Sequence, residues 1–379
     1  MNGTIIGAGI GGLTTAIALQ HQNINTNIYE ASSQLLPIGA GILVPPNAMA
    51  VMDKLGLAET ITQNGVTISK IAIDNIKGTT ISCNDASHQH ASKKYNTIAI
   101  HRGALQQILL ANIAANTLIT DKKCTDVLQD HHHAQAWFHD GTSQKSDFLI
   151  GADGLNSNIR KILFPNTHLR NAEQLCWRGV ANYSLDNKHR QQLTEIWGNG
   201  TRFGYVQIND NEVYWYATKK SNSQSIDTKN TAQQLPEDFS QYPKAVSNII
   251  HQTPPQNIIK NLIHDLPPQP RWGRNRITLI GDAAHPMTPN LGQGGAQAIE
   301  DAWALSQHLA SDLTATEAFQ NFYDSRHAKA NKIIKMSWQI GQISNISNKF
   351  LCSARNIALS LVPAPVATKQ SNFIYQLDK

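Results

Sequence analysis

The stretch Gly7-Ala8-Gly9-Ile10-Gly11-Gly12 decides the fold, because it places G-x-G-x-x-G directly after the short apolar run 4–6. Apolar residues then recur at helical spacing from Leu13 to Gln22, and residues 26–30 read as a second strand. This order predicts a parallel strand–helix–strand unit. In such a unit the glycines permit a tight turn, a close approach of a pyrophosphate and close helix packing, with the helix amides facing the phosphates.

Glu30 ends the second predicted strand, where its carboxylate can accept hydrogen bonds from a ribose diol. A carboxylate at this place disfavours a 2′-phosphate, so the motif indicates FAD or NAD and not NADP. A glycine turn without any ligand is the alternative interpretation.

Two later segments repeat the pattern of a buried strand followed by an acidic turn. Residues 148–160 read FLIGADGLNSNIR, and residues 276–286 read RITLIGDAAHP before a glycine-rich entry into a helix at 287–295. A carboxylate after a buried strand, such as Asp153 or Asp282, can bind a polyol hydroxyl. A glycine-rich helix start can stabilise negative charge on a ring carbonyl. Together these features favour FAD.

Between these segments the apolar pattern changes to alternation, at residues 71–97 and again at 173–266, with a hairpin turn at 209–211. Helical spacing returns at Ala296–Leu309 and at Ala328–Ile343. We therefore predict an α/β protein with a doubly wound, Rossmann-like FAD-binding domain, an inserted antiparallel β-sheet substrate domain and C-terminal helices. The predicted boundaries are 1–70, 98–172 and 268–330 for the FAD-binding domain, 71–97 and 173–267 for the substrate domain, and 331–379 for the C-terminal helical segment.

The composition excludes several classes of protein. The 379 residues are 41% hydrophobic, and the net charge of +5 is dispersed, so we expect a folded protein that does not bind nucleic acid. The four cysteines lie far apart, which predicts no disulfide framework and a cytoplasmic location. No apolar run is long enough to span a membrane, so no integral membrane association is expected. The clusters His88–His90 and His131–His133 predict solvated loops and no metal site.

Together, the three segments resemble the fingerprints of the group A FAD-dependent aromatic hydroxylases, the monooxygenases of the p-hydroxybenzoate hydroxylase fold, over about residues 1–345. The pattern is most similar to shorter members such as the salicylate, 3-hydroxybenzoate and urate hydroxylases. The resemblance implies a bound FAD, NADH or NADPH as a transient co-substrate, and O₂. It also implies a flavin C4a-hydroperoxide that transfers oxygen to a small aromatic or heteroaromatic substrate.

The resemblance also assigns roles to individual positions. Arg202, Tyr214 and Pro289 match catalytic positions, and Arg178, Arg202, Tyr214 and Gln293 match substrate-binding positions. The implied FAD contacts are Gly7, Gly9, Gly11, Gly12, Glu30, Ala31, Arg102, Gln106, Asp153, Gly281, Asp282, Pro289, Gly292, Gly294, Gly295 and Ala296.

Several alternatives remain open. Arg178 and Arg202 could be surface arginines, and Tyr214 could be ordinary sheet packing. Arg178 stands where urate hydroxylases carry asparagine, which disfavours urate. The scaffold could also serve an epoxidase or a hydroxylase of an isoprenoid, polyketide or tetracycline-like compound, a geranylgeranyl-type reductase, or a binding protein without redox activity. A halogenase is disfavoured because the W-x-W-x-I-P pattern is missing. We expect a monomer or homodimer.

Overall fold

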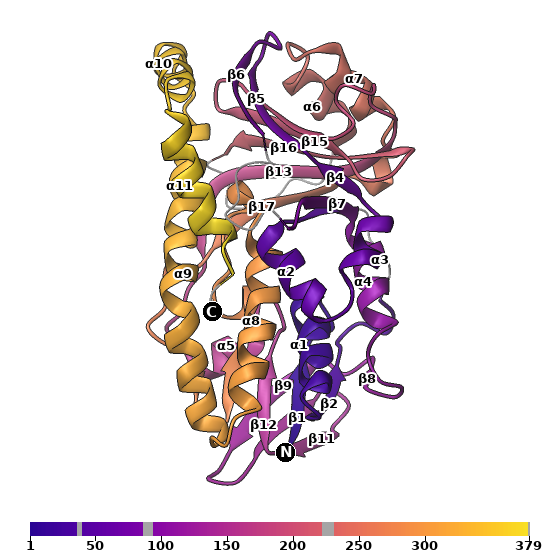
Figure 1. Cartoon of the computed structure of the whole chain (residues 1–379), viewed down its shortest axis with the longest axis vertical. Coiled ribbons are helices and arrows are strands. Elements are labelled where there is room, and N and C mark those ends of the chain that lie inside the picture. Colours follow the sequence, from indigo (N-terminus) through magenta and orange to yellow (C-terminus); the bar gives the residue numbers. More distant parts are fainter. Residues whose placement is uncertain (36–39, 86–93, 222–230, 378–379) are drawn as a thin grey trace.

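The computed structural model describes residues 1–35, 40–85, 94–221 and 231–377, so His88 and His90 lie outside the described residues. Two large sheets lie toward opposite ends of the molecule, and the long helix α9 (Ala315–Ser344) runs along one side of both (Figure 1). The site residues predicted from the sequence come from both halves, so the way the two halves meet determines the site.

The first sheet joins distant parts of the chain. Its strands, in spatial order, are β18 (Gly273–Arg274), β19 (Ile277–Leu279), β12 (Phe148–Gly151), β1 (Asn2–Ile6), β2 (Asn25–Tyr29) and β8 (Leu118–Ile119). All neighbours pair in parallel except β18 and β19, and Ile5 lies between Ile28 and Ile150 in register. The predicted doubly wound sheet is confirmed.

The elements around this sheet come from separate parts of the chain. Helix α1 (Ile10–His21) packs against α8 (Gly294–Leu309). A three-stranded sheet of β9 (Cys124–Gln129), β10 (Ala134–Phe138) and β11 (Ser143–Ser146) packs against β1 and β12, and the sequence analysis did not predict it. The remaining elements are β3 (Gly41–Val44), α2 (Pro46–Lys54), α3 (Ala58–Gln63), β4 (Val66–Ile68), β7 (Thr97–His101), α4 (Arg102–Leu110) and α5 (Asn158–Leu163).

The second large sheet is the inserted one. Its strands, in spatial order, are β17 (Ile259–Asp265), β13 (Arg170–Asn182), β16 (Glu212–Lys220), β15 (Thr201–Gln207), β14 (Gln192–Trp197), β5 (Lys70–Asn75) and β6 (Thr80–Asp85). All pairs are antiparallel except β14 with β5. The two alternating segments of the sequence therefore meet in one sheet, as predicted.

The two faces of this sheet differ because successive residues of a strand point to opposite sides. Trp177, Phe203 and Trp215 pack on one face with Phe239, beneath α6 (Thr231–Asp238) and α7 (Lys244–His251) (Figure 1). These two helices were not predicted. The adjacent residues of the strands, including Arg178 and Arg202, lie on the other face, which we call the polar face.

The C-terminal part is helical, as predicted, but α9 begins at Ala315 and not at Ala328. Thr314 and Glu317 form a capping box at its start, a local pattern that the helical spacing alone did not reveal. Residue 330 therefore lies inside one continuous helix. Two shorter helices follow, α10 (Lys349–Ser360) and α11 (Ala364–Tyr375). Among the described residues, no helix is both long and apolar enough to cross a bilayer.

Candidate active site

The glycine turn between β1 and α1 is shaped by its own backbone. Gly7 has a φ of +104°, and a Cβ on Gly12 would lie 1.9 Å from the Gly7 oxygen, so neither position accepts a side chain without strain. Gly11 faces Ala298 of α8, where an added Cβ would come within 3.2 Å. A Cβ on Gly9 would meet no atom within 4 Å. The protein itself leaves the space beside Gly9 open, which is where a pyrophosphate can approach the backbone.

Two side chains hold Ala8 at the centre of this turn. Glu30 Oε2 accepts a hydrogen bond from the Ala8 amide at 2.8 Å, and Gln106 Nε2 donates to the Ala8 oxygen at 3.0 Å. Glu30 Oε1 accepts from the Ser32 amide at 2.8 Å, and Ala31 is exposed between them. The Glu30 carboxylate thus lies beside the turn, with lone pairs left for a ribose hydroxyl.

Asp282 follows β19 and lies near three basic side chains. Burial raises the pKa of Asp282, and His285, Arg102 and Arg160 oppose that rise. Asp282 is nevertheless accessible to solvent. Arg102 is exposed at the start of α4, where its amide donates to the Ala40 oxygen at 2.8 Å. A polyol chain bound at Asp282 would find an acceptor there with the Arg102 cation nearby.

Asp153 and Arg160 lie in the segment 148–160, and Arg160 connects it to the segment 276–286. Asp153 Oδ2 accepts from the Asn158 and Ile159 amides at 2.8 and 3.2 Å, so this carboxylate caps α5, and burial raises its pKa. Arg160 Nη1 donates to the backbone carbonyl oxygens of Asp282 at 3.2 Å and of Ala283 at 2.8 Å. Arg160 was not predicted as a site residue, although it stands in the quoted segment. The Arg160 side chain follows a polar turn, and only the structure shows that it is buried.

The segment 281–293 leads into α8 and lies between the two halves of the molecule. We call it the wall segment. Gly281 has a φ of +52° and Gly292 a φ of +62°, so both take the left-handed conformation that glycine favours. Pro289 is exposed at the start of a short 3₁₀ turn, Pro289–Leu291. Gly294 and Gly295 open α8, and Ala296 is buried. The first amides of a helix have no intrahelical acceptor, so they are available to a ligand above Gly292.

A network of buried charged side chains holds the wall segment from the interior of the protein. Asp301 Oδ2 accepts from the Gly281 amide at 2.9 Å and contacts His285 Nε2 at 2.5 Å, while Arg326 Nε donates to Asp301 Oδ1 at 3.0 Å. Burial alone would raise the pKa of Asp301, but His285, Arg326 and the Gly281 amide together lower it to about 2. Glu300, beside Asp301, pairs with Arg326 and with Lys329 Nζ at 2.8 Å. No local pattern of the sequence predicts this network.

Gln293 belongs to the same interior and not to the polar face. Its side chain is fully buried, and its Oε1 accepts from Asn47 Nδ2 at 3.1 Å and from Gln297 Nε2 at 3.2 Å. Asn47 Nδ2 also donates to Glu300 Oε1 at 2.5 Å. The side chain predicted to bind substrate therefore points into the protein beneath the Pro289–Gly292 segment.

Arg202 brings the polar face of the sheet to the wall segment. Its side chain is 1% exposed, and its Nη2 donates to Asn290 Oδ1 at 2.6 Å, one residue from Pro289. Its Nη1 lies 3.8 Å from Glu195 Oε2. Burial alone would lower the pKa of Arg202, but Glu195 and nearby groups raise it, so the guanidinium stays charged. Asn290 and Glu195 are site residues that the sequence analysis missed.

Tyr214 and Arg178 lie on the same face. Tyr214 pairs with Val180 in register and packs against the apolar cluster around Val206, and burial raises its pKa above the ordinary value of 10, although Arg178 opposes this. Arg178 Nη2 donates to Asn261 Oδ1 of β17 at 2.7 Å. Arg178 Nε and the Nε and Nη1 atoms of Arg202 are buried and have no hydrogen-bond partner among the described residues. Such donors are costly to bury unless a ligand or water accepts from them.

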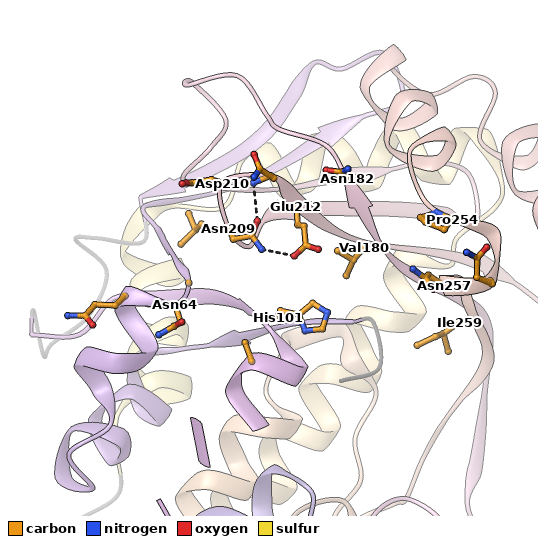
Figure 2. A pocket seen from close by; sticks show the side chains of 16 residues that line it. Asn64, His101, Val180, Asn182, Asn209, Asp210, Glu212, Pro254, Asn257 and Ile259 are labelled. Atoms are coloured by element: carbon orange, nitrogen blue, oxygen red, sulfur yellow. Dashed lines mark hydrogen bonds between the residues drawn. The ribbon is translucent and has the colours of Figure 1, made fainter. Parts of the chain in front are cut away.

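An open groove of about 1090 Å³ begins next to these residues (Figure 2). Val180, paired with Tyr214, and Ile259, paired with Arg178, line its inner part together with His101. Farther out the lining is rich in carboxamides, including those of Asn182 and Asn257, and it contains no lysine or arginine. The groove therefore adjoins the strand positions of Tyr214 and Arg178, and its lining contains no lysine or arginine.

The comparisons with known proteins fit this geometry. The model of the family described as "FAD binding domain" matches residues 2–337. The aurachin C monooxygenase/isomerase of Stigmatella aurantiaca is 36% identical over 351 residues, which are 93% of this chain and 91% of that protein. The chain belongs to the FAD-binding domain family. It is an FAD-dependent monooxygenase with the fold of the aromatic hydroxylases.

Further relatives of this flavoprotein extend the likeness. The 2-heptyl-3-hydroxy-4(1H)-quinolone synthase of Pseudomonas aeruginosa is 29% identical over 362 residues, which are 95% of this chain and 94% of that enzyme. The crystal structure of Klebsiella pneumoniae HpxO complexed with FAD and uric acid superposes with a TM-score of 0.89 at 25% identity, over 98% of this chain and 95% of that one. The relatives matched over most of the chain are monooxygenases and hydroxylases, so the enzyme prediction is confirmed over the alternative of a binding scaffold without redox activity.

Proposed function

We propose that this flavoprotein hydroxylates a ring carbon of a 4-quinolone or a closely related heteroaromatic compound, with NADH or NADPH and O₂ as co-substrates. The observation that supports the proposal most directly is the set of unbonded guanidinium N–H groups of Arg178 and Arg202 on the polar face, beside Asn290 and Pro289. The quinolone synthase supports the ring class through its likeness over 95% of the chain. A cytoplasmic location and a monomeric or homodimeric state stay predictions.

FAD fits the residues of the first half. The open space at Gly9 suits a pyrophosphate, the accessible Asp282 suits the ribityl hydroxyls, and the first amides of α8 suit a carbonyl of the flavin ring. When bound, FAD takes up a hydride from NAD(P)H and delivers one atom of O₂ to the substrate. We assign its ADP half to Gly7, Gly9, Gly11, Gly12, Glu30 and Ala31, its middle to Arg102, Gln106, Asp153, Gly281 and Asp282, and its ring to Pro289, Gly292, Gly294, Gly295 and Ala296.

The polar face supplies recognition. A ring oxygen, such as O4 of a quinolone, can accept from Arg202 Nε or Nη1 and from Arg178 Nε, which removes the cost of burying these donors. Tyr214 would contact the ring from the side of Val180, near the groove through which a substrate can enter. Gln293 would act as a positioning residue, because its side chain supports the wall segment from the interior.

The chemistry follows from the charges. Cationic donors at O4 stabilise the enolate form of a quinolone, and in that form the adjacent carbon C3 is the nucleophile toward an electrophilic oxygen. The carbon exchanges its C–H bond for a C–OH bond, the second oxygen atom leaves as water, and NAD(P)H is oxidised. Trp197, which is buried and pairs with Arg202 in register on the same face, keeps water away from this place.

The test uses the FAD-loaded enzyme with 2-heptyl-4-quinolone, salicylate, 3-hydroxybenzoate and uric acid. NADH and NADPH oxidation, H₂O₂ release and incorporation of ¹⁸O from ¹⁸O₂ are measured for each compound. We expect the quinolone to accelerate NAD(P)H oxidation with little H₂O₂ and to gain one labelled oxygen. Labelled product from salicylate or urate but not from the quinolone would contradict the substrate class. Cofactor oxidation that ends in H₂O₂ with every compound would contradict it as well.

A further inference from the structure

Helix α10 turns its apolar side outward. Phe350 is 87% exposed, Ile357 61% and Leu361, just beyond the helix end, 72%. With Ala354 these residues follow the spacing i, i+4, i+7 and i+11, so they form one stripe on the helix. An ordinary surface helix buries its apolar stripe and exposes its polar side. In α10 the arrangement is reversed.

The polar side of α10 is fastened to the protein. Arg355 is buried, and its Nη2 donates to the Gly198 oxygen at 3.2 Å in the turn before β15. Cys352, also buried, contacts the Ile346 oxygen through its Sγ at 3.0 Å, and the Gly200 amide donates to the same oxygen at 2.8 Å. The orientation of the helix is therefore held by specific contacts, and the exposed stripe is a built feature of the fold.

The apolar surface continues beyond the helix. Leu351, Val362 and Val366 are exposed next to the stripe, and Ile343 is exposed near the end of α9. We call these residues, together with the stripe, the apical patch. Figure 1 shows α10 at one end of the molecule, far from the three-stranded sheet at the other end. Exposed large apolar residues gathered at one end of a folded protein mark a docking surface.

The charge of the C-terminal residues indicates which partner binds the apical patch. From residue 325 to residue 377 the chain contains no aspartate or glutamate, and it contains seven lysines and arginines. Arg326, Lys329 and Arg355 are buried, and the other four are exposed: Lys332, Lys335, Lys349 and Lys369. A second copy of this chain would bring like charges together at a two-fold contact. An anionic lipid surface offers negative headgroups to the lysines and an acyl interior to the apolar stripe.

We propose that the apical patch docks the enzyme on anionic phospholipid membranes, with α10 lying in the interface and Lys349 and Lys369 near the headgroups. The docking needs no spanning helix, because an interfacial helix buries only one side. Helix α10 is fastened to the turn that leads into β15, the strand of Arg202, so the docked end is the end that contains the substrate sheet. The proposal does not depend on which aromatic compound is hydroxylated.

The experiment is flotation of the FAD-loaded full chain with vesicles of phosphatidylcholine alone or of phosphatidylcholine mixed with phosphatidylglycerol. We expect the protein to float with the anionic vesicles and high salt to release it. The double variant Phe350→Ser with Leu361→Ser should lower the bound fraction by about tenfold or more. The double variant Lys349→Gln with Lys369→Gln should weaken binding to anionic vesicles only.

The matched control is Leu128→Ser, which removes an exposed leucine (57% exposed) from β9 at the other end of the molecule and should bind like the wild type. FAD content and circular dichroism show that each variant is folded. Absence of binding to anionic vesicles would overturn the proposal. So would equal loss in Leu128→Ser, or a wild-type dimer in light scattering that Phe350→Ser with Leu361→Ser converts to a monomer, because the patch would then be a contact between copies.

Discussion

The glycine turn at the start of α1 and the polar face of the inserted sheet, which we propose serve one reaction, are built by different means. The turn is made by backbone, with left-handed Gly7 and a Gly12 position that excludes any side chain. The polar face is made by side chains on neighbouring strands, and Arg202 meets the wall segment through a single side-chain hydrogen bond to Asn290. Changes in the turn should therefore affect FAD binding, and changes on the face should affect turnover of the FAD-loaded enzyme.

The largest effect is expected at Gly12. In Gly12→Ala the new Cβ would lie 1.9 Å from the Gly7 oxygen, so the turn must deform, and we expect loss of nearly all bound FAD and a lower Tm. Gly9→Ala has room within the protein and should fold with the wild-type Tm of the FAD-free chain, but with weaker FAD binding. Absorbance of the flavin and thermal unfolding measure both. A fully FAD-loaded Gly12→Ala would contradict the backbone account.

On the polar face, Arg202→Gln should lower kcat/KM by about 100-fold, because it removes a buried cation that we propose binds the substrate oxygen. FAD content should stay at the wild-type level, which separates this variant from Gly12→Ala. The control Arg190→Gln removes an arginine that pairs with Asp210 at the surface and should change kcat/KM little. A loss of less than about threefold in Arg202→Gln would place Arg202 among structural residues.

The buried ions beneath the wall segment add a dependence on pH. The folded pKa of Asp301 is lowered from 3.8 to about 2, so this carboxylate stabilises the protein above pH 4 and loses that contribution as the pH falls toward 2. The contribution is on the order of 2 kcal/mol in the free energy of unfolding. The free energy of unfolding of the wild type should therefore fall more steeply with decreasing pH between pH 4 and pH 2.

Asp301→Asn tests the origin of that dependence. The variant should be less stable at neutral pH and show a flatter profile between pH 4 and 2, whereas Asp324→Asn, which removes an exposed carboxylate of α9, should keep the wild-type profile. Chemical denaturation at several pH values measures this. If the free energy of unfolding changed equally with pH in the wild type and in Asp301→Asn, Asp301 would not be the source of the pH dependence.

The smallest effect is expected at Tyr214. Tyr214→Phe removes one hydroxyl from the proposed substrate site and should lower kcat/KM about three- to tenfold. Because burial keeps the pKa of Tyr214 above 10, the phenol stays protonated up to that pH, and the pH profile of kcat/KM below 10 should be the same in both proteins. Tyr205→Phe, on the opposite face, should leave kcat/KM unchanged. An alkaline limb that disappears in Tyr214→Phe would contradict the stated protonation.

Much of the fold could be predicted because local patterns decide it. The strand, turn and helix around Gly7–Gly12 and the alternation in β13, β15 and β16 correspond to the observed elements. Helices α6 and α7 were missed, and so was the start of α9 at Ala315. Helix α7 does place Val246, Ile249 and Ile250 at helical spacing, but eight residues are too few to distinguish a short helix from a strand by periodicity, and a capping box is a pattern of single residues.

The sequence by itself determined that a dinucleotide-type turn opens the chain, that acidic turns follow two later strands, and that an alternating sheet lies between them. These properties depend on backbone conformation and on residues a few positions apart. Only the tertiary structure decided that Arg202 meets Asn290, that Gln293 points inward to Asn47, and that Asp301 holds the Gly281 amide. Such contacts join residues 20 to 246 positions apart. They depend on strand register and on the rotation of packed helices, which no local pattern specifies.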